Sequence, residues 1–394
     1  MSDMNNPLAG DIGEEINEEL LPATGAWLAG SDPGEKRFAD IGVLELELGA
    51  KLPVRIAYET WGEYNGHNAV LLCHPLTGDS HACGIGGWWS DIVGPGKAID
   101  TEKFYVVAPN VLGGCQGTTG PASLAADARP YGSRFPEITV RDQVRAEAAL
   151  ADFLGIQAWR FIAGASAGGQ RVMEWAASFP QRTQSFAVLV SNAEATAEQI
   201  AFCRQQHAAI LLDPAFRGGD YYDAEVGNGP HRGLCLARAI AHTTYRCHTE
   251  LDSRFGNSPQ AGEVTLAAGN TIAGFRRAGR FAAESYLDYH GNKLAARFDA
   301  NSYLVLNRAM STHSIGRGRG GTAAVLASLT MPALVVNVDS DRLFYPDDVA
   351  ALAAALPGAN GVATVTSKFG HDGFLIESAQ VAKIIAEFLQ REKI

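Results

Sequence analysis

The sequence lacks the excess of positive charge that a nucleic-acid-binding protein needs. It holds 32 Lys and Arg residues against 43 Asp and Glu residues, which gives a net charge of −11. Binding nucleic acid requires a dense basic face. We therefore expect no nucleic-acid partner, whereas an anionic small ligand remains possible because a few local arginines can bind one.

Long apolar runs are missing as well. No run approaches the roughly 18 residues of a transmembrane helix, and Met1–Asn6 shows no basic region followed by an apolar stretch. We expect no membrane partner and no signal peptide, and we predict a cytoplasmic protein.

Paired cysteines and clustered histidines are also absent. The six cysteines form no Cys-x-x-Cys pair, and the ten histidines form neither a His-Glu-x-x-His motif nor a tight cluster. Disulfides are rare in reducing compartments. We interpret the cysteines as free, mostly buried thiols and expect neither a metal site nor a bound cofactor.

What the chain does contain is enough apolar sequence for a large core, since 46% of its 394 residues are hydrophobic. That length suits several domains or one α/β domain with an insertion. Residues 1–35 are polar and acidic, and we predict a poorly ordered N-terminal arm there.

Two strand patterns follow the arm. Ile41–Leu48 alternates apolar and acidic residues, which predicts a half-buried strand, and Val54–Trp61 is typical of its antiparallel partner. Short continuous apolar runs come next and are typical of parallel strands buried on both faces. These runs are Ala69–Cys73, Phe104–Ala108, Phe161–Ala163, Phe186–Val190 and Ala333–Val338.

Helical patterns such as Val140–Leu154 and Gly168–Phe179 separate these runs, which predicts a mostly parallel sheet with helices on both faces. Residues 195–316 break the rhythm, with little strand signal and several helical stretches. We predict an α/β core over residues 36–194 and 317–394, and a helical lid inserted at 195–316.

A candidate nucleophile lies between a predicted strand and a predicted helix. Gly164-Ala-Ser166-Ala-Gly168 matches G-x-S-x-G, and small residues flank the serine as a sharp turn requires. The motif alone is weak, because a serine in a glycine-rich turn or at a helix N-cap also fits it. In this context it predicts Ser166 as the nucleophile of an α/β-hydrolase fold.

The candidate base and acid follow later in the chain, in the order Ser, acid, His that this fold uses. His371 and the competing Asp339 and Asp341 lie in loops after predicted strands, at the carboxyl edge where such sheets place their sites. Asp341 is favoured because Asp-x-Leu before a proline is the usual context of the acid. His371 would take the serine proton, and the carboxylate would fix the imidazole tautomer.

Attack by a serine on an acyl group also requires backbone N–H donors for the oxyanion. One is expected from Ala167, directly after the nucleophile, and the other from the loop after Ala69–Cys73. Pro75 has no N–H, so Leu76 is the predicted second donor.

Motifs spread over roughly residues 40 to 380 resemble one family closely, the homoserine O-acetyltransferases. The matching motifs include Leu76-Thr-Gly-Asp-Ser-His, Gly94-Pro-Gly-Lys-Ala-Ile-Asp, Asn110-Val-Leu-Gly-Gly-Cys-Gln-Gly-Thr-Thr-Gly-Pro, Gly316-Arg-Gly-Arg-Gly-Gly and Gly370-His-Asp-Gly-Phe-Leu.

The resemblance implies acetyl transfer from acetyl-CoA to the hydroxyl of L-homoserine, in methionine biosynthesis. It implies a ping-pong mechanism through an acyl-enzyme and a homodimer formed through the lid helices. It further implies that Arg238 binds the substrate carboxylate, that Tyr245 lines the same tunnel and that Asp372 meets the substrate ammonium. A surface salt bridge for Arg238 and a loop cap for Asp372 are the alternatives.

The chain departs from the family pattern near the nucleophile. It reads Gly-Ala-Ser166-Ala-Gly-Gly-Gln-Arg171 where Gly-Gly-Ser-Met-Gly-Gly-Met-Gln is common, and Pro75 replaces a common alanine. Ala167 leaves more space beside the acyl group. The alternatives to acetyl transfer onto homoserine are a succinyl-CoA donor, serine or another alcohol as acceptor, a plain esterase, or a binding protein without activity.

The glycine-arginine run at the end of the predicted lid is a further candidate. A flexible hinge is the favoured interpretation of this run, and the alternative is that Arg317 and Arg319 meet the phosphates of CoA at the tunnel mouth.

Overall fold

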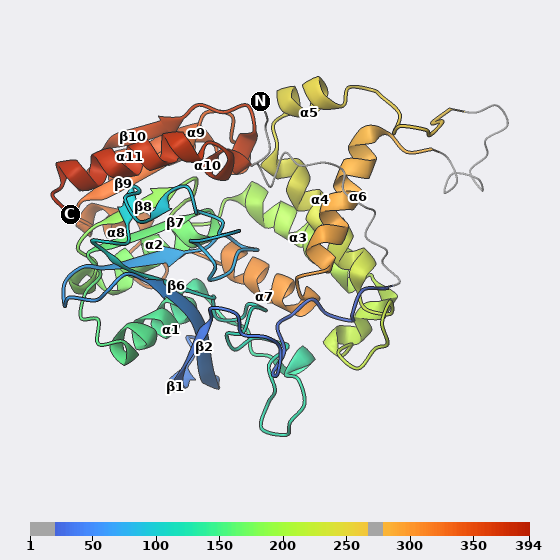
Figure 1. The fold of residues 1–394 in the computed structure, drawn as a ribbon, viewed down its shortest axis with the longest axis horizontal. Coiled ribbons are helices and arrows are strands. Elements are labelled where there is room, and N and C mark those ends of the chain that lie inside the picture. Colours follow the sequence, from blue (N-terminus) through green and yellow to red (C-terminus); the bar gives the residue numbers. More distant parts are fainter. Residues whose placement is uncertain (1–19, 267–278) are drawn as a thin grey trace.

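A computed structural model describes residues 20–266 and 279–394, and its centre is an eight-stranded sheet (Figure 1). In spatial order the strands are β1 (Arg37–Glu45), β2 (Lys51–Trp61), β6 (Tyr105–Pro109), β3 (Ala69–Cys73), β7 (Phe161–Ala165), β8 (Phe186–Leu189), β9 (Ala333–Val338) and β10 (Ala359–Val365). In this order, every neighbouring pair from β6 to β10 is parallel, and β2 runs antiparallel to both β1 and β6. The predicted, mostly parallel sheet is confirmed.

The central strands are apolar because both of their faces are covered. Every residue of β3, β7, β8 and β9 is buried, as continuous apolar runs predict. The first strand differs from the prediction: β1 begins and ends a few residues before Ile41–Leu48, and most of its side chains are at least partly exposed. Its antiparallel pairing with β2 is confirmed.

Helices pack on both faces of the sheet. One face carries α1 (Val140–Phe153), α2 (Ala167–Ser178), α8 (Thr322–Ser328) and α9 (Pro346–Ala355). The other face carries α11 (Ser378–Arg391), which follows the short α10 (Gly373–Ile376). The start of α1 is fixed by a capping box in which Thr139 and Asp142 satisfy each other's backbone N–H groups. The carboxyl ends of the parallel strands therefore lie at one edge of the sheet, between the two layers of helices.

Between β8 and α8 the described residues are mainly helical, and α3, α4 and α6 lie together beside the sheet in Figure 1. The two ends of this insertion meet, because Glu194 and Ser314 form a β-bridge flanked by hydrogen bonds from Ala195 N to His313 O and from Ile315 N to Ala193 O, both 3.0 Å. Residues 195–316 remain our proposed bounds for a lid. Its elements are α3 (Ala197–Leu211), η4 (Pro214–Gly219), α4 (His231–Tyr245), α5 (His248–Arg254), α6 (Ala282–Ala295) and α7 (Ala300–Ser311).

The predicted arm at residues 1–35 is described only from residue 20 onward, and its first 19 residues lie outside the described part. Residues 20–35 make specific contacts with the rest of the chain. Gly25 N donates to Phe298 O at 3.1 Å, and Trp27 N donates to Cys115 O at 2.8 Å. Leu21 is buried among the residues of the inserted helices. This part of the arm therefore connects the insertion to the core.

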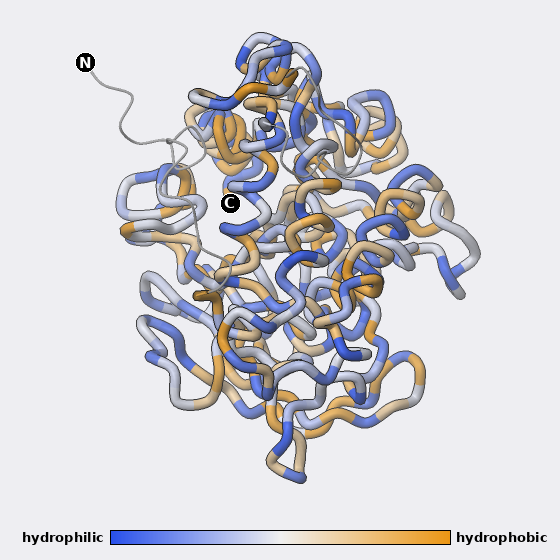
Figure 2. The backbone as a smooth tube through the Cα atoms, turned by 90° about the vertical axis from the view of Figure 1, so that its right-hand side faces the viewer, coloured by the Kyte–Doolittle hydropathy of each residue, from blue (hydrophilic) through white to orange (hydrophobic). Residues whose placement is uncertain are grey.

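Hydrophobic and hydrophilic residues alternate in short stretches along the chain in Figure 2. Within residues 20–266 and 279–394, no helix has the length and apolarity needed to cross a membrane. The same residues contain no group of three or more His, Cys, Asp or Glu side chains that could hold a metal ion. All six cysteines are free thiols, and five of them are buried.

Candidate active site

Ser166 lies at the sharp junction between β7 and α2. Its φ of 56° falls in the left-handed region that non-glycine residues rarely adopt, so the turn is strained. Gly168 is required beside it, because a Cβ at that position would collide with the carbonyl oxygen of Cys73 at the end of β3. Two hydrogen bonds fix the strained turn in place, one from Ser166 N to Leu189 O at 3.0 Å and one from Ser191 Oγ to Ser166 O at 2.7 Å.

His371 and Asp341 form a buried hydrogen-bonded pair, with 2.7 Å between His371 Nδ1 and Asp341 Oδ2. The other oxygen of Asp341 accepts from the backbone N–H groups of Leu343 and Phe344 at 2.8 and 3.0 Å. The carboxylate is therefore fixed by the backbone on one side and bound to the imidazole on the other. Such a pair sets the tautomer in which Nε2 is free to accept a proton.

The competing acid, Asp339, has a different environment. Its Oδ1 accepts from Ser367 N at 3.0 Å, which braces the loop before His371. Between the two candidates of the sequence analysis, only Asp341 has a hydrogen bond to His371 among the described residues. This geometry favours Asp341 as the orienting acid.

The charge state of His371 reflects two opposing influences. Burial by itself lowers the pKa of His371, but the charge and hydrogen bond of Asp341, with a contribution from Asp372, raise this pKa above its ordinary value. Phe344 stacks on the ring with centroids 5.3 Å apart. The site therefore favours the imidazolium that a general base forms on taking a proton.

Ser166 Oγ has no hydrogen-bond partner within 3.5 Å among the described residues, so it does not bond to His371 in the free protein. Catalytic hydrogen bonds are often long before substrate binds. The backbone N–H groups of Leu76 and Ala167 likewise donate to no described acceptor. Both lie beside one small cavity of about 20 Å³, room for about one water molecule.

The residues predicted to contact substrate gather around His371. The guanidinium of Arg238, on α4, lies 5.2 Å from the centre of the Tyr245 ring, and that ring lies 5.7 Å from the His371 ring. Arg238 Nε is buried without a hydrogen-bond partner, and the described residues offer its guanidinium no ion pair. Asp372 is buried, and Arg246 Nη1 lies 3.5 Å from its carboxylate. Burial raises the pKa of Asp372, while the charges of Arg246, Arg238 and His371 oppose that rise.

Comparison with known proteins identifies the family. The profile described as the alpha/beta hydrolase fold matches residues 68–378. The homoserine O-acetyltransferase of Thermobifida fusca (strain YX) is 52% identical over 380 residues, covering 94% of this chain and 97% of the relative. The chain belongs to the homoserine O-acetyltransferase family. The predicted fold class and family resemblance are thereby confirmed.

Solved structures support the same fold. A homoserine O-acetyltransferase from Staphylococcus aureus superposes with a TM-score of 0.70 at 26% identity, covering 90% of this chain and 94% of that one. Esterase E22 superposes with a TM-score of 0.80 at 25% identity, covering 90% and 99%. The fold alone therefore does not separate acyl transfer from ester hydrolysis.

Arg317 and Arg319 are both paired with carboxylates of the same chain. Arg317 pairs with Glu47 at 2.9 Å, and Arg319 pairs with the buried Glu174 at 2.6 Å. Arg141 joins both carboxylates, at 2.9 and 3.5 Å. These ion pairs join the end of the insertion to the core, so the structure does not support the alternative that these arginines meet the phosphates of CoA.

Sequence reasoning missed three arginines near the site. Arg246, on the loop after α4, is bound by both oxygens of Glu250 and reaches Asp372. Arg297 donates to Thr77 O at 2.9 Å, directly after the predicted donor Leu76. Arg171 stands out in the sequence only as a departure from the family pattern. No local motif marks these residues, because their partners lie far away in the sequence or carry no signature of their own.

Proposed function

We propose that this chain transfers an acetyl group from acetyl-CoA to the side-chain hydroxyl of L-homoserine, in methionine biosynthesis. The observation that carries the proposal is the 52% identity to a homoserine O-acetyltransferase over 94% of the chain. The nucleophile turn and the His371–Asp341 pair supply the chemistry that such a transfer needs.

In the first half-reaction, Ser166 Oγ attacks the thioester carbonyl carbon while its proton passes to His371 Nε2. The N–H groups of Leu76 and Ala167 stabilise the alkoxide of the tetrahedral intermediate. Collapse breaks the carbon–sulfur bond, and the departing thiolate takes the proton from His371 to give free CoA. Ser166 then carries the acetyl group as an ester.

In the second half-reaction, the homoserine hydroxyl gives its proton to His371 and attacks the acetyl ester. Collapse of the second intermediate returns this proton to Ser166 and releases O-acetylhomoserine. Arg238 has the fork of donors that binds a carboxylate bidentately, and no described carboxylate occupies it. The Tyr245 ring contacts this guanidinium, and we propose that Asp372 meets the substrate ammonium.

A transferase must favour its acceptor over water. A well-oriented hydroxyl reaches effective molarities of about 10⁵ M or more, which outcompetes bulk water if the site is enclosed. The inserted helices come close to His371: a Cβ on the neighbouring Gly370 would lie 2.7 Å from Tyr245 O, at the end of α4. We propose that residues 195–316 act as this lid.

We propose a homodimer formed through the lid helices. On and just after α3, Ile200, Leu211 and Leu212 are 46%, 56% and 80% exposed, and Leu236 on α4 is 54% exposed. Exposed apolar side chains on neighbouring helices are typical of protein–protein contacts. We also expect the enzyme to act in the cytoplasm, where acetyl-CoA is available and the free thiols stay reduced.

The second candidate function is an esterase, favoured by the superposition with esterase E22. A matrix of donors (acetyl-, propionyl- and succinyl-CoA) against acceptors (homoserine, serine and water) separates the candidates, with free thiol as the readout. We expect fast thiol release only with acetyl-CoA and homoserine together. Equal release without an acceptor would replace the transferase by a hydrolase, and a preference for succinyl-CoA or serine would change the substrates.

A further inference from the structure

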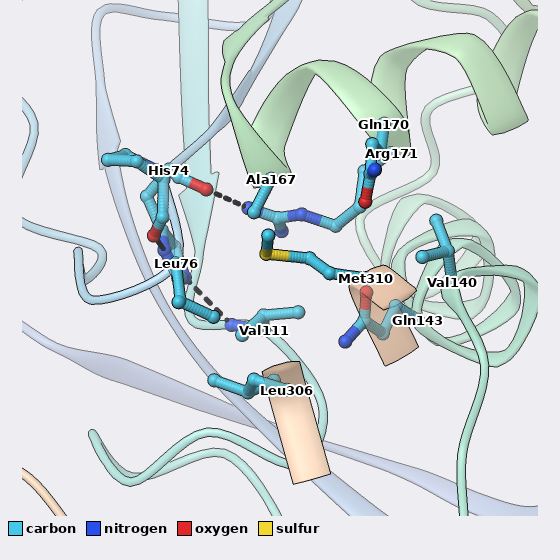
Figure 3. Close-up of a pocket in the computed structure, with 11 residues that line it drawn as sticks. His74, Leu76, Val111, Val140, Gln143, Ala167, Gln170, Arg171, Leu306 and Met310 are labelled. Carbon is cyan, nitrogen blue, oxygen red and sulfur yellow. Dashed lines mark hydrogen bonds between the residues drawn. The ribbon is translucent and has the colours of Figure 1, made fainter. Parts of the chain in front are cut away.

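Arg171 is a buried cation beneath the loop that carries the predicted oxyanion donor Leu76. It belongs to α2, five residues after the nucleophile, and its side chain points toward His74 in Figure 3. Its Nη2 donates to the backbone oxygen of His74 at 2.6 Å. Only 2% of Arg171 is exposed, so this bond is shielded from water.

The charge of Arg171 is held by one carboxylate. Its Nη1 lies 2.5 Å from Glu147 Oε1, and Trp175 Nε1 donates to Glu147 Oε2 at 2.7 Å. Glu147 is 3% exposed and belongs to α1, the helix packed beside α2. Because both oxygens are bonded and the pair is shielded from solvent, it has one defined position, and removing either partner leaves an uncompensated buried charge.

The loop itself is fixed at two successive carbonyl groups. His74 O accepts from Arg171, and Pro75 O accepts from the His74 ring at 2.8 Å and from Gly78 N at 2.9 Å. Val111 N donates to His74 Nε2 at 3.0 Å, so the ring proton must lie on Nδ1, which donates to Pro75 O. Burial and then the charge of Arg171 lower the pKa of His74 to about 3, which keeps the ring neutral.

These bonds decide where Leu76 N–H points. The peptide group between Pro75 and Leu76 is planar and trans, so its N–H is directed opposite to Pro75 O. Holding Pro75 O in place therefore aims the Leu76 N–H. The carbonyl of His74, bound by Arg171, is the preceding fixed point of the same loop.

We infer that Arg171, held by Glu147, is a positioning residue that aims the Leu76 N–H at the developing oxyanion through its bond to His74 O. The inference rests on the proposed function, because it assigns Leu76 its role in acyl transfer. Arg171 acts through the loop and makes no bond to His371, so its effect falls on the rate of acylation and not on acceptor binding.

Two double variants isolate the bond to His74 O. Glu147→Gln with Arg171→Gln removes both charges but keeps an amide donor, whereas Glu147→Gln with Arg171→Met removes both charges and the donor. The probe is p-nitrophenyl acetate, whose burst of p-nitrophenol reports acylation of Ser166 without acetyl-CoA or homoserine. We expect the glutamine double within about threefold of the wild-type burst rate and the methionine double about 10- to 100-fold slower.

The burst separates positioning from folding. A purely structural role would lower the burst amplitude and the melting temperature while the remaining active protein kept its burst rate. We expect the methionine double to keep the amplitude, the homoserine KM and the pH midpoint of acylation while its burst rate falls. The matched control is Glu137→Gln with Arg308→Gln, an exposed pair 2.9 Å apart, which should leave the burst rate unchanged.

Equal burst rates in the two folded doubles would overturn the inference. If the methionine double does not fold, the glutamine double decides alone, since a folded glutamine double that acylates more than tenfold slower would show that charge rather than the bond matters. If the wild-type protein is acylated but fails to pass the acetyl group to homoserine, the proposed function fails while the comparison of the doubles still tests the inference.

Discussion

The core and the inserted helices hold charge differently where they face Ser166. On the core side, Asp341 is bonded to His371 and Arg171 to Glu147, each within 2.7 Å. On the inserted side, Arg246 is paired with Glu250, but Arg238 and Arg297 have no ion pair within the described residues. Paired charges keep one geometry before substrate binds, which suits residues that take part in or support the catalytic steps. Unpaired cations are left for an anionic substrate, which suits recognition.

The largest expected effect comes from removing the nucleophile on the core side. Ser166→Ala should lower acyl transfer by more than about 10⁴-fold, since the acyl-enzyme can no longer form. The melting temperature should change little, because no side-chain hydrogen bond of Ser166 is lost among the described residues. Mass spectrometry after mixing with acetyl-CoA should show an added acetyl group on the wild-type protein only. Near-normal turnover in the variant would refute the assignment of Ser166 as the nucleophile. Ser328→Ala, on α8, is the control.

A smaller effect is expected from the inserted side. Arg238→Gln should raise the homoserine KM about 10- to 100-fold, because a charged hydrogen bond is worth about 1.5–3 kcal/mol. The rate of acylation should stay near that of the wild type. Arg232→Gln, on an exposed position of the same helix, is the matched control. If homoserine kinetics are unchanged, Arg238 does not bind the substrate and the contrast between the two sides fails.

The pH dependence tests how Asp341 acts. His371 must be neutral to accept a proton, and its pKa is raised above the ordinary 6.5. Acylation should therefore be lost as the pH falls, with a midpoint above about 6.5. Asp341→Asn removes the main influence that raises this pKa, so the midpoint should move to lower pH while the rate falls by about 10⁴-fold. A midpoint that does not move would show that Asp341 does not set the charge of His371.

The smallest effect is expected at Arg317. Because Arg317 pairs with Glu47, Arg317→Gln should change the KM of acetyl-CoA by less than about threefold. Acetyl-pantetheine, which lacks the nucleotide phosphates, serves as the comparison donor. A large rise in KM for acetyl-CoA alone would restore Arg317 as a phosphate-binding residue.

Much of this arrangement could be predicted from sequence because its signals are local. The runs at β3 and β9 matched their strands at both ends, and the pattern over 140–154 matched α1 within one residue. Ser166, Asp341 and His371 each stand in a short motif next to a strand. Their roles stay proposals, but the hydrogen bond between the last two supports the choice of Asp341 over Asp339.

What could not be predicted depends on contacts between distant residues. Arg171 and Glu147 are 24 positions apart, and Arg317 and Glu47 are 270 apart. A glycine-arginine run gives no sign of whether its guanidiniums meet a ligand or a carboxylate of the same chain. The position of β1 was misjudged because its alternating pattern extends into the turn before β2.

The β-bridge between Glu194 and Ser314 has a further consequence. Because the insertion leaves and rejoins the core at this one bridge, it can lengthen, shorten or be exchanged during evolution without disturbing the neighbouring strands. Changes in the helices between Glu194 and Ser314 can then select a new acceptor, while the serine, the histidine and their hydrogen bonds are inherited unchanged. One ancestral catalytic platform can in this way give rise to enzymes that pass an acyl group to an amino acid or to water.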